Sequence, residues 1–201
     1  MGKRQNLKVK AAGQNIKVSN KWTLFVTALA FVLTVAMSVI STGAEGLGLF
    51  SAICVLLLIV ILGILFDIIG MAVSTASEEP FHAMAAKKIH GAKESVTIIH
   101  SAQQISSVCN DVIGDIAGII SGAMTTAIVV AICSNTKQNA TLLNLVFAGV
   151  VAALMIGGKA AGKGIAMKNN NTIVFIIGKL VYVFKKLFFI KAKTKKNKRQ
   201  V

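Results

Sequence analysis

Two carboxylates stand at the start of an otherwise apolar stretch of this chain. The run that contains Asp111 and Asp115 continues without further charge to Cys133. A carboxylate at membrane depth costs roughly 2.5–3.5 kcal/mol at a helix centre, so it usually marks an ion path or a buried partner. On a helix, Ser107, Asp111 and Asp115 share one face, with Cβ atoms about 5–6 Å apart. In a poorly hydrated site, a proton, a cation or a basic side chain should therefore join the two carboxylates.

The polar residues around this pair offer oxygen atoms. Asn110 begins a neighbouring helical stripe of small residues, whose spacing of four is typical of close packing between membrane helices. Asp67, near the end of another apolar stretch, lies at a comparable depth. Oxygen ligands suit a hard ion such as Mg²⁺, which keeps several waters and takes one or two carboxylates. The sequence predicts a divalent-cation site with these candidate metal ligands: Asn110, Asp111, Asp115, Asp67, Ser107 and Ser106.

Two lysines offer another way to neutralise the acidic pair. Lys159 and Lys163 follow a later apolar stretch at a spacing of four and also lie near a membrane boundary. Pairing with Asp111 and Asp115, at separations within about 4 Å, would leave no room for an ion. Both interpretations stay open, because charged residues within membranes can line an ion path and can also pair with each other.

Other catalytic or cofactor-binding chemistry has little support. The chain shows no Ser/His/Asp arrangement, phosphate-binding loop or heme motif, so we expect no enzyme activity and no covalently bound cofactor. The histidines are separated by eight and ten residues, which is not the spacing of a zinc site. They are His82, His90 and His100.

The composition is that of a membrane protein. Of the 201 residues, 55% are hydrophobic and only 14% are charged, whereas about 25% are charged in a soluble domain. A bilayer core requires about 20 apolar residues per helix. About four stretches meet or approach this length: Trp22–Thr42, Leu49–Ile69, Val108–Cys133 and Leu142–Gly158. An alternative for the first is a signal peptide cleaved after Ala44.

The basic residues predict the orientation of the chain. Of 22 Lys and Arg residues, six precede the first stretch, three lie in 78–107 and twelve lie in 159–199. With four spans these regions share one side, which the positive-inside rule makes the cytoplasm. We therefore expect a multi-pass protein of the cell membrane with both termini cytoplasmic. The basic residues that give the net charge of +15 flank the apolar stretches, and no nucleic-acid recognition motif accompanies them. We therefore expect no nucleic-acid partner.

Two further segments complete the predicted all-α membrane fold. Residues 78–107 read as a cytoplasmic helical hairpin, with helices from Glu79 to His90 and from Ala92 to about Gln104, and with Pro80 in the first turn. Residues 172–190 read as a C-terminal juxtamembrane amphipathic helix, with its lysines near anionic headgroups. The four parts of the chain are then a basic cytoplasmic arm (1–21), an N-terminal membrane helix and outer loop (22–48), a membrane domain (49–190) and a basic tail (191–201).

The order of these features resembles a known family. Residues 49–190 are similar to the transmembrane domain of the CorB/CorC and cyclin M (CNNM) magnesium/cobalt transporters. Residues Phe66–Ala72 stand at the family's Phe-Ser-Gly-Ser-Glu-like motif, and Cys109–Gly114 stand at its Gly-Asn-Asn-Leu-Val-Asn motif. Residues Ile156–Lys163 stand at its Gly-Glu-x-x-Pro-Lys motif. Two motif glutamates fall at Gly70 and Gly158, the family's cytoplasmic domains are missing, and the span at 22–42 is extra.

The resemblance implies a function for this domain. It implies a homodimer in the lipid bilayer that binds or moves a divalent cation, Mg²⁺ or Co²⁺, with Na⁺ as a possible coupling ion. Asn110 matches a site asparagine of the family, and Asp111 replaces the next one. The alternative is a non-transporting membrane scaffold or regulatory subunit, in which Lys159 and Lys163 neutralise the acidic pair.

Overall fold

The computed structural model describes residues 20–46, 48–135 and 139–197, of which residues 44, 45, 135 and 188–197 are described by their helix alone. Most of the predicted basic arm, residues 136–138 and the end of the basic tail therefore lie outside the described residues. Helices hold 93% of the described chain, which contains no strand. The all-α prediction is confirmed.

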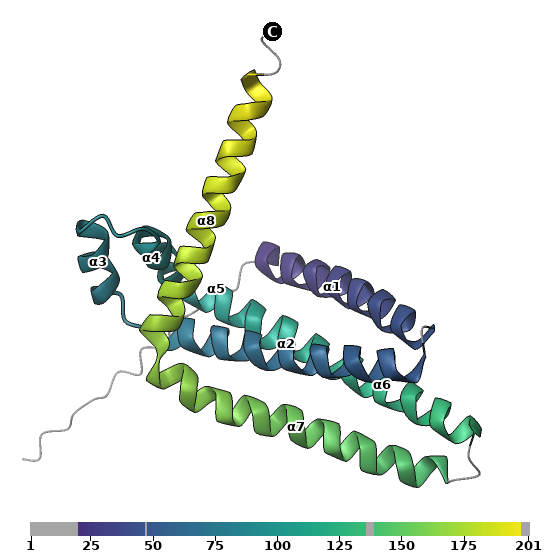
Figure 1. Cartoon of the computed structure of the whole chain (residues 1–201). Coiled ribbons are helices and arrows are strands. Elements are labelled where there is room, and N and C mark those ends of the chain that lie inside the picture. Colours follow the sequence, from purple (N-terminus) through teal and green to yellow (C-terminus); the bar gives the residue numbers. More distant parts are fainter. Residues whose placement is uncertain (1–19, 47, 136–138, 198–201) are drawn as a thin grey trace, which may run out of the picture.

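Four helical segments are long and apolar enough to cross a membrane. Three are α1 (Asn20–Gly46), α2 (Leu49–Thr75) and α7 (Ala140–Lys168). The other runs over Ala102–Ser134 and comprises α5 (Ala102–Ser107), a π-helical turn η1 (Val108–Ile113) and most of α6 (Gly114–Asn135). In Figure 1 these segments lie side by side as a bundle. Each continues beyond the apolar stretch that predicted it.

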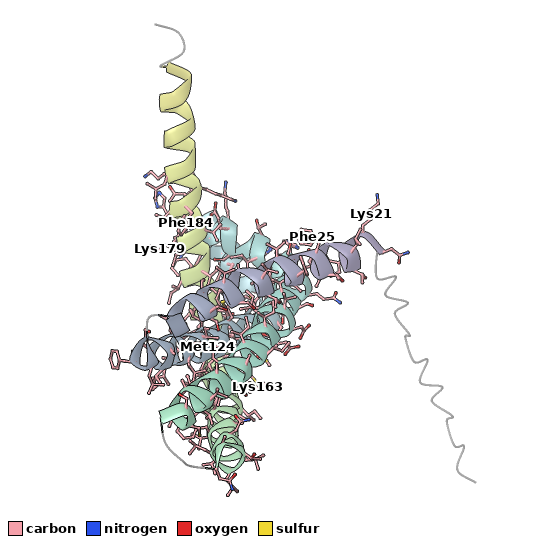
Figure 2. The ribbon with its side chains drawn as sticks, turned by 90° about the vertical axis from the view of Figure 1, so that its right-hand side faces the viewer. Lys21, Phe25, Met124, Lys163, Lys179 and Phe184 are labelled. Atoms are coloured by element: carbon pink, nitrogen blue, oxygen red, sulfur yellow. The ribbon has the colours of Figure 1, made fainter. Side chains whose placement is uncertain are left out.

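The centre of the bundle is the pair formed by α2 and α6. Within the apolar window of 102–134, 44% of the residues are buried, whereas none are buried in that of α1. Ile59 of α2 and Met124 of α6 are both almost completely buried, and Figure 2 shows Met124 between the bundle helices. α1 and α7 pack against the outside of this pair, so most of their apolar surface is left for lipid.

A glycine allows the three central helices to approach closely. A Cβ atom on Gly63 of α2 would lie 2.8 Å from the Cβ of Ala117 in α6 and 2.9 Å from the Cε of Met155 in α7. Distances this short do not occur between real side chains. Small residues at such points are the usual means of association between helices in a membrane.

A pair of short helices connects α2 to α5. α3 spans Glu79–Ala86, with Pro80 in its first turn as predicted, and α4 spans Ala92–His100. α3 ends four residues before the predicted boundary, because the chain turns through positive φ at Lys88 (58°) and Gly91 (92°). α4 also ends earlier than predicted, and a break at Ser101 separates it from α5.

The last helix, α8 (Asn170–Asn197), rises steeply from the bundle beside α4 (Figure 1). Val174 is completely buried in an apolar cluster with Val73, Phe81 and Ile98. A Cβ atom on Gly178 would lie 2.8 Å from the carbonyl oxygen of Gly91, so the backbones of α8 and the hairpin are in direct contact. Farther along α8, Lys179 and Phe184 are exposed (Figure 2).

We predict that Gly63→Ala destabilises the bundle by about 1–3 kcal/mol, the usual cost of overpacking. The added methyl group collides with Ala117, whose Cβ cannot move without moving α6. Thermal unfolding of the detergent-solubilised chain measures the effect. Gly157→Ala is the matched control, because a Cβ there meets nothing within 4 Å. Equal melting temperatures for both variants would contradict this packing.

Candidate functional site

The chain leaves regular α-helical geometry where its polar residues begin. Residues Val108–Ile113 form the π-helical turn η1, at whose end the backbone N–H of Gly114 donates to the carbonyl oxygen of Cys109, five residues earlier. π turns are rare and often occur at functional sites. The predicted face shared by Ser107, Asp111 and Asp115 assumed regular α-helical geometry. The π turn therefore changes which of its polar side chains face the bundle.

Asn110 turns toward α2. A Cβ atom on Gly70 would lie 2.7 Å from the Cγ of Asn110 and 3.1 Å from its Nδ2, so the amide group packs directly on the backbone of α2. Its Nδ2 donates to the Oγ of Ser106 at 3.3 Å. Its Oδ1 is buried and has no hydrogen-bond partner within the described part of the chain.

Asp67 is the second polar group with a buried, unpartnered oxygen. The residue is only 7% exposed, and its Oδ2 has no hydrogen-bond partner in residues 20–46, 48–135 and 139–197. Buried polar atoms without partners are uncommon in folded proteins, and a buried carboxylate is costly unless something compensates its charge.

The helix geometry places Asp67 and Asn110 on facing surfaces. Gly63, Asp67 and Gly70 lie on one face of α2, since residues three and four apart are neighbours on a helix. On the facing segment Gly63 meets Ala117, and Gly70 meets Asn110. Asp67 therefore lies between these two contacts and faces the end of η1. The two unpartnered oxygens therefore belong to residues on facing surfaces of α2 and η1.

The other predicted ligands point elsewhere. Asp111 is exposed, and its Oδ2 accepts a hydrogen bond from Ser107 Oγ at 3.0 Å. Asp115 is also exposed and lines an open groove of about 490 Å³ between α6 and α7, together with Gly118 and Lys159. Asn110 and Ser106 are thus in contact on the segment that faces the Asp67 side of α2, whereas Ser107 is bonded to the exposed Asp111, and Asp115 is exposed on the groove.

Lys159 of α7 lies close to the end of the π turn. Its Nζ donates to the carbonyl oxygen of Gly114 at 3.5 Å, just beyond the π turn, whereas Lys163 is exposed. The ion pairs found in the described chain involve Glu78 and Glu94, and neither Asp111 nor Asp115 takes part in one. The predicted pairing of the two lysines with this acidic pair within about 4 Å is therefore absent from the described residues.

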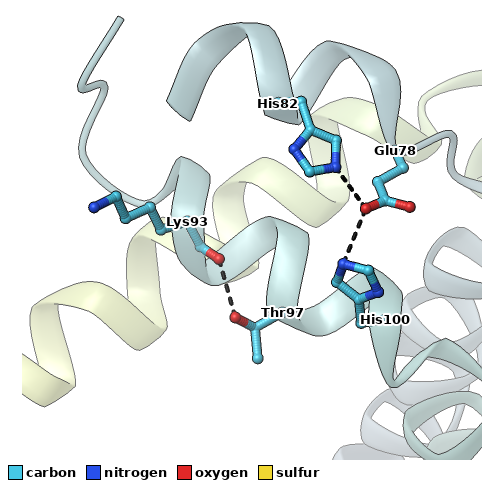
Figure 3. A network of polar contacts seen from close by, with 5 residues as sticks. All are labelled: Glu78, His82, Lys93, Thr97 and His100. Carbon is cyan, nitrogen blue, oxygen red and sulfur yellow. Dashed lines mark hydrogen bonds and ion pairs between the residues drawn. The ribbon is translucent and has the colours of Figure 1, made fainter. Parts of the chain in front are cut away.

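A second polar cluster was not among the predicted sites. Glu78 contacts His82 and His100 at the start of α3 and the end of α4 (Figure 3). The Glu78–His82 spacing of four is a helical contact that the sequence already contains. His100 joins them only because the hairpin closes. His90 is separate from this cluster, with its ring 5.1 Å from that of Tyr182.

We predict that, in the absence of divalent cations, Asp67→Asn stabilises the chain by about 1–3 kcal/mol, because it removes a buried charge that lacks a partner. Thermal unfolding in detergent with a chelator measures the change. Asp111→Asn is the matched control and should have a much smaller effect, because Asp111 is exposed and already bonded to Ser107. A clear loss of stability in Asp67→Asn would mean that the carboxylate already has a compensating partner.

Comparison of the chain with protein-family models, curated proteins and solved structures finds no significant match to any of them. The chemistry of the described side chains is therefore the basis on which a function is assigned.

Proposed function

We propose that this chain is a multi-pass membrane protein that binds a divalent cation, Mg²⁺ in the first place, between α2 and the π turn, and moves it across the membrane. One observation carries the proposal. Asp67 of α2 and Asn110 of η1 each have a buried oxygen without a hydrogen-bond partner in the described chain, and helix geometry puts the two residues on facing surfaces. A cation would compensate both the charge of the carboxylate and the unused amide oxygen.

The donor set favours a hard ion. The carboxylate of Asp67 and the amide oxygen of Asn110 are oxygen ligands, and the hydroxyl of Ser106 is bonded to the same amide group. Mg²⁺ is commonly held by one or two carboxylates and keeps several of its waters. In this proposal the exposed Asp111 and Asp115, and Ser107, which donates to Asp111, are not among the ligands. The resemblance to CorB/CorC and cyclin M proteins points the same way, because both Asp67 and Asn110 fall on its motifs.

The proposed orientation follows from charge. The hairpin of α3 and α4, the start of α8 and both termini lie on the cytoplasmic side of the cell membrane, where the positive-inside rule places their basic residues. The steep angle of α8 to the bundle suits a helix in the plane of the interface, with exposed lysines such as Lys179 near the headgroups (Figure 1).

The resemblance also implies a homodimer. Asp111 and Asp115 are exposed on a segment that is apolar enough to lie in the membrane. Carboxylates in such segments normally face a bundle interior or a water-filled cavity, because contact with lipid is costly. A second copy that covers this surface, or an aqueous groove between two copies, would provide that environment.

A non-transporting scaffold is the second candidate function, and one contact favours it. The Nζ of Lys159 reaches the carbonyl oxygen of Gly114 at 3.5 Å, and Gly114 lies between Asn110 and Ala117 on the segment that faces Asp67. In this alternative the ammonium group supplies the positive charge in the region, and no free cation binds.

Calorimetric titration of the full chain in detergent with Mg²⁺ tests the proposal. We expect saturable binding that is lost in Asp67→Asn and weakened at least about tenfold, or by 1.4 kcal/mol, in Asn110→Ala. The double variant Asp111→Asn/Asp115→Asn should keep most of the affinity, because these carboxylates are exposed on another surface. Affinity that depended on Asp111 and Asp115 but not on Asp67 would refute the site proposed here.

A substitution that touches no ligand gives an independent test. Gly70→Ala should weaken Mg²⁺ binding, because its methyl group takes the space of the Asn110 amide and displaces Oδ1, the proposed ligand atom. Gly157→Ala again serves as the control, since a Cβ there meets no atom within 4 Å. Unchanged binding in Gly70→Ala would show that the amide position is irrelevant to the ion.

The scaffold alternative predicts a different pattern. The native chain would bind no Mg²⁺, while Lys159→Met, which removes the internal positive charge, would create or strengthen binding. Should the native chain bind Mg²⁺, flux into proteoliposomes, compared between the native chain and Asp67→Asn, then distinguishes transport from binding alone.

A further inference from the structure

The Glu78 cluster brings three metal-ligand side chains to one point at the end of the bundle. The Nε2 of His82 lies 2.6 Å from the Oε1 of Glu78, and the Nε2 of His100 lies 3.0 Å from the same oxygen. All three ligand atoms lie within 4.8 Å of one another. Figure 3 shows both imidazole rings directed at the carboxylate from different helices.

The backbone around the cluster is held in place by packing. Glu78 precedes the first residue of α3, His82 follows one turn later, and His100 is the last residue of α4. Phe81, next to His82, is completely buried, and Ile98, two residues before His100, is 7% exposed. Both belong to the apolar cluster that joins the hairpin to α2 and α8. The three side chains therefore project from a fixed base, while their polar ends stay accessible to water.

From this geometry we propose that Glu78, His82 and His100 form a binding site for a transition-metal dication of the Zn²⁺ class. Two imidazole nitrogens and one carboxylate oxygen are ligands that Zn²⁺ and its neighbours prefer, whereas Mg²⁺ and Ca²⁺ prefer oxygen alone. Three protein ligands leave a coordination position for water, the ligand count that is also found in catalytic zinc sites. The site goes beyond the proposed magnesium function and does not depend on it.

The spacing of the ligand atoms is close to what Zn²⁺ requires. Ligand atoms about 2.0–2.2 Å from a tetrahedral Zn²⁺ stand roughly 3.3 Å apart. The two contacts of 2.6 and 3.0 Å would lengthen by less than about 1 Å to admit the ion. The Glu78 and His100 side chains are 36% and 63% exposed, so this adjustment needs only side-chain rotation.

The position of the site gives the metal a structural effect. Glu78 lies three residues after the end of α2, and His100 lies two residues before the start of α5. An ion bound to both would link the exit of one membrane helix to the entrance of the next. Zn²⁺ should therefore restrict the motion of the whole hairpin rather than that of one side chain.

The test is a titration of the full, untagged chain in detergent micelles with Zn²⁺ by calorimetry and with Co²⁺ by visible absorption. We expect one ion per chain and the intense visible bands of Co²⁺ bound with low coordination number. Binding should weaken at least about tenfold in His82→Ala, His100→Ala and Glu78→Gln. His90→Ala is the matched control, because this exposed histidine of the same hairpin packs on Tyr182 and lies outside the cluster.

Two further measurements distinguish the possible outcomes. Hydrogen exchange over residues 76–101 should slow on addition of Zn²⁺ in the native chain but not in His100→Ala. Asp67→Asn should bind Zn²⁺ as the native chain does, so a failure of the magnesium site would leave this result unchanged. Absence of Zn²⁺ binding in a native chain with normal helical circular dichroism would overturn the proposal. Equal binding by the His82→Ala, His100→Ala and His90→Ala variants would overturn it as well.

Discussion

The close approach of α2 to the segment formed by η1 and α6 is the constraint on which the rest of the structure depends. Lipid tails are as apolar as the helix surfaces, so association in a bilayer depends on packing at short distance. Gly63 and Gly70 supply that distance by leaving space for Ala117 and Asn110. The same approach removes Asp67 and the Asn110 amide from water and leaves one oxygen of each without a partner. The contact that holds the helices together therefore also creates the charged, poorly solvated interface of the candidate site.

Much of the fold could be predicted from the sequence, because the physics of a membrane helix is mainly a matter of length and charge. The four apolar stretches and Pro80 correctly indicated the four long helices and the start of α3. The expected ligands do not share one surface. Asn110 and Asp67 have buried oxygens without partners, whereas Asp111 and Asp115 are exposed, and the predicted shared face assumed a regular helix. The backbone hydrogen bonds of η1 have no local sequence signal, so their effect on side-chain direction was not foreseeable. His100 was missed because its partners come from another helix.

The two polar clusters differ in chemistry and in depth. The one between α2 and the π turn offers oxygen atoms and is shielded by the bundle, whereas the one on the hairpin combines nitrogen with oxygen and is open to water. Two segments of the chain connect one cluster to the other. α2 runs from Asp67 toward Glu78, and α5 leads from His100 back to Asn110. The hairpin is therefore a short bridge between the two helices that face each other in the membrane.

The π turn also makes the number of residues in this stretch as important as their identity. The hydrogen bond from Gly114 to Cys109 spans five residues instead of the four of an α-helix, so η1 contains about one residue more than regular winding needs. Deleting one residue within 108–113 would therefore replace the π turn by α-helix and leave α5 nearly in phase with α6. Inserting one more residue would instead rotate α5 and the hairpin by about 100° relative to α6, and the hairpin would lose its alignment with α8. The connection between α2 and α6 is thus expected to tolerate a single-residue deletion in η1 better than an insertion.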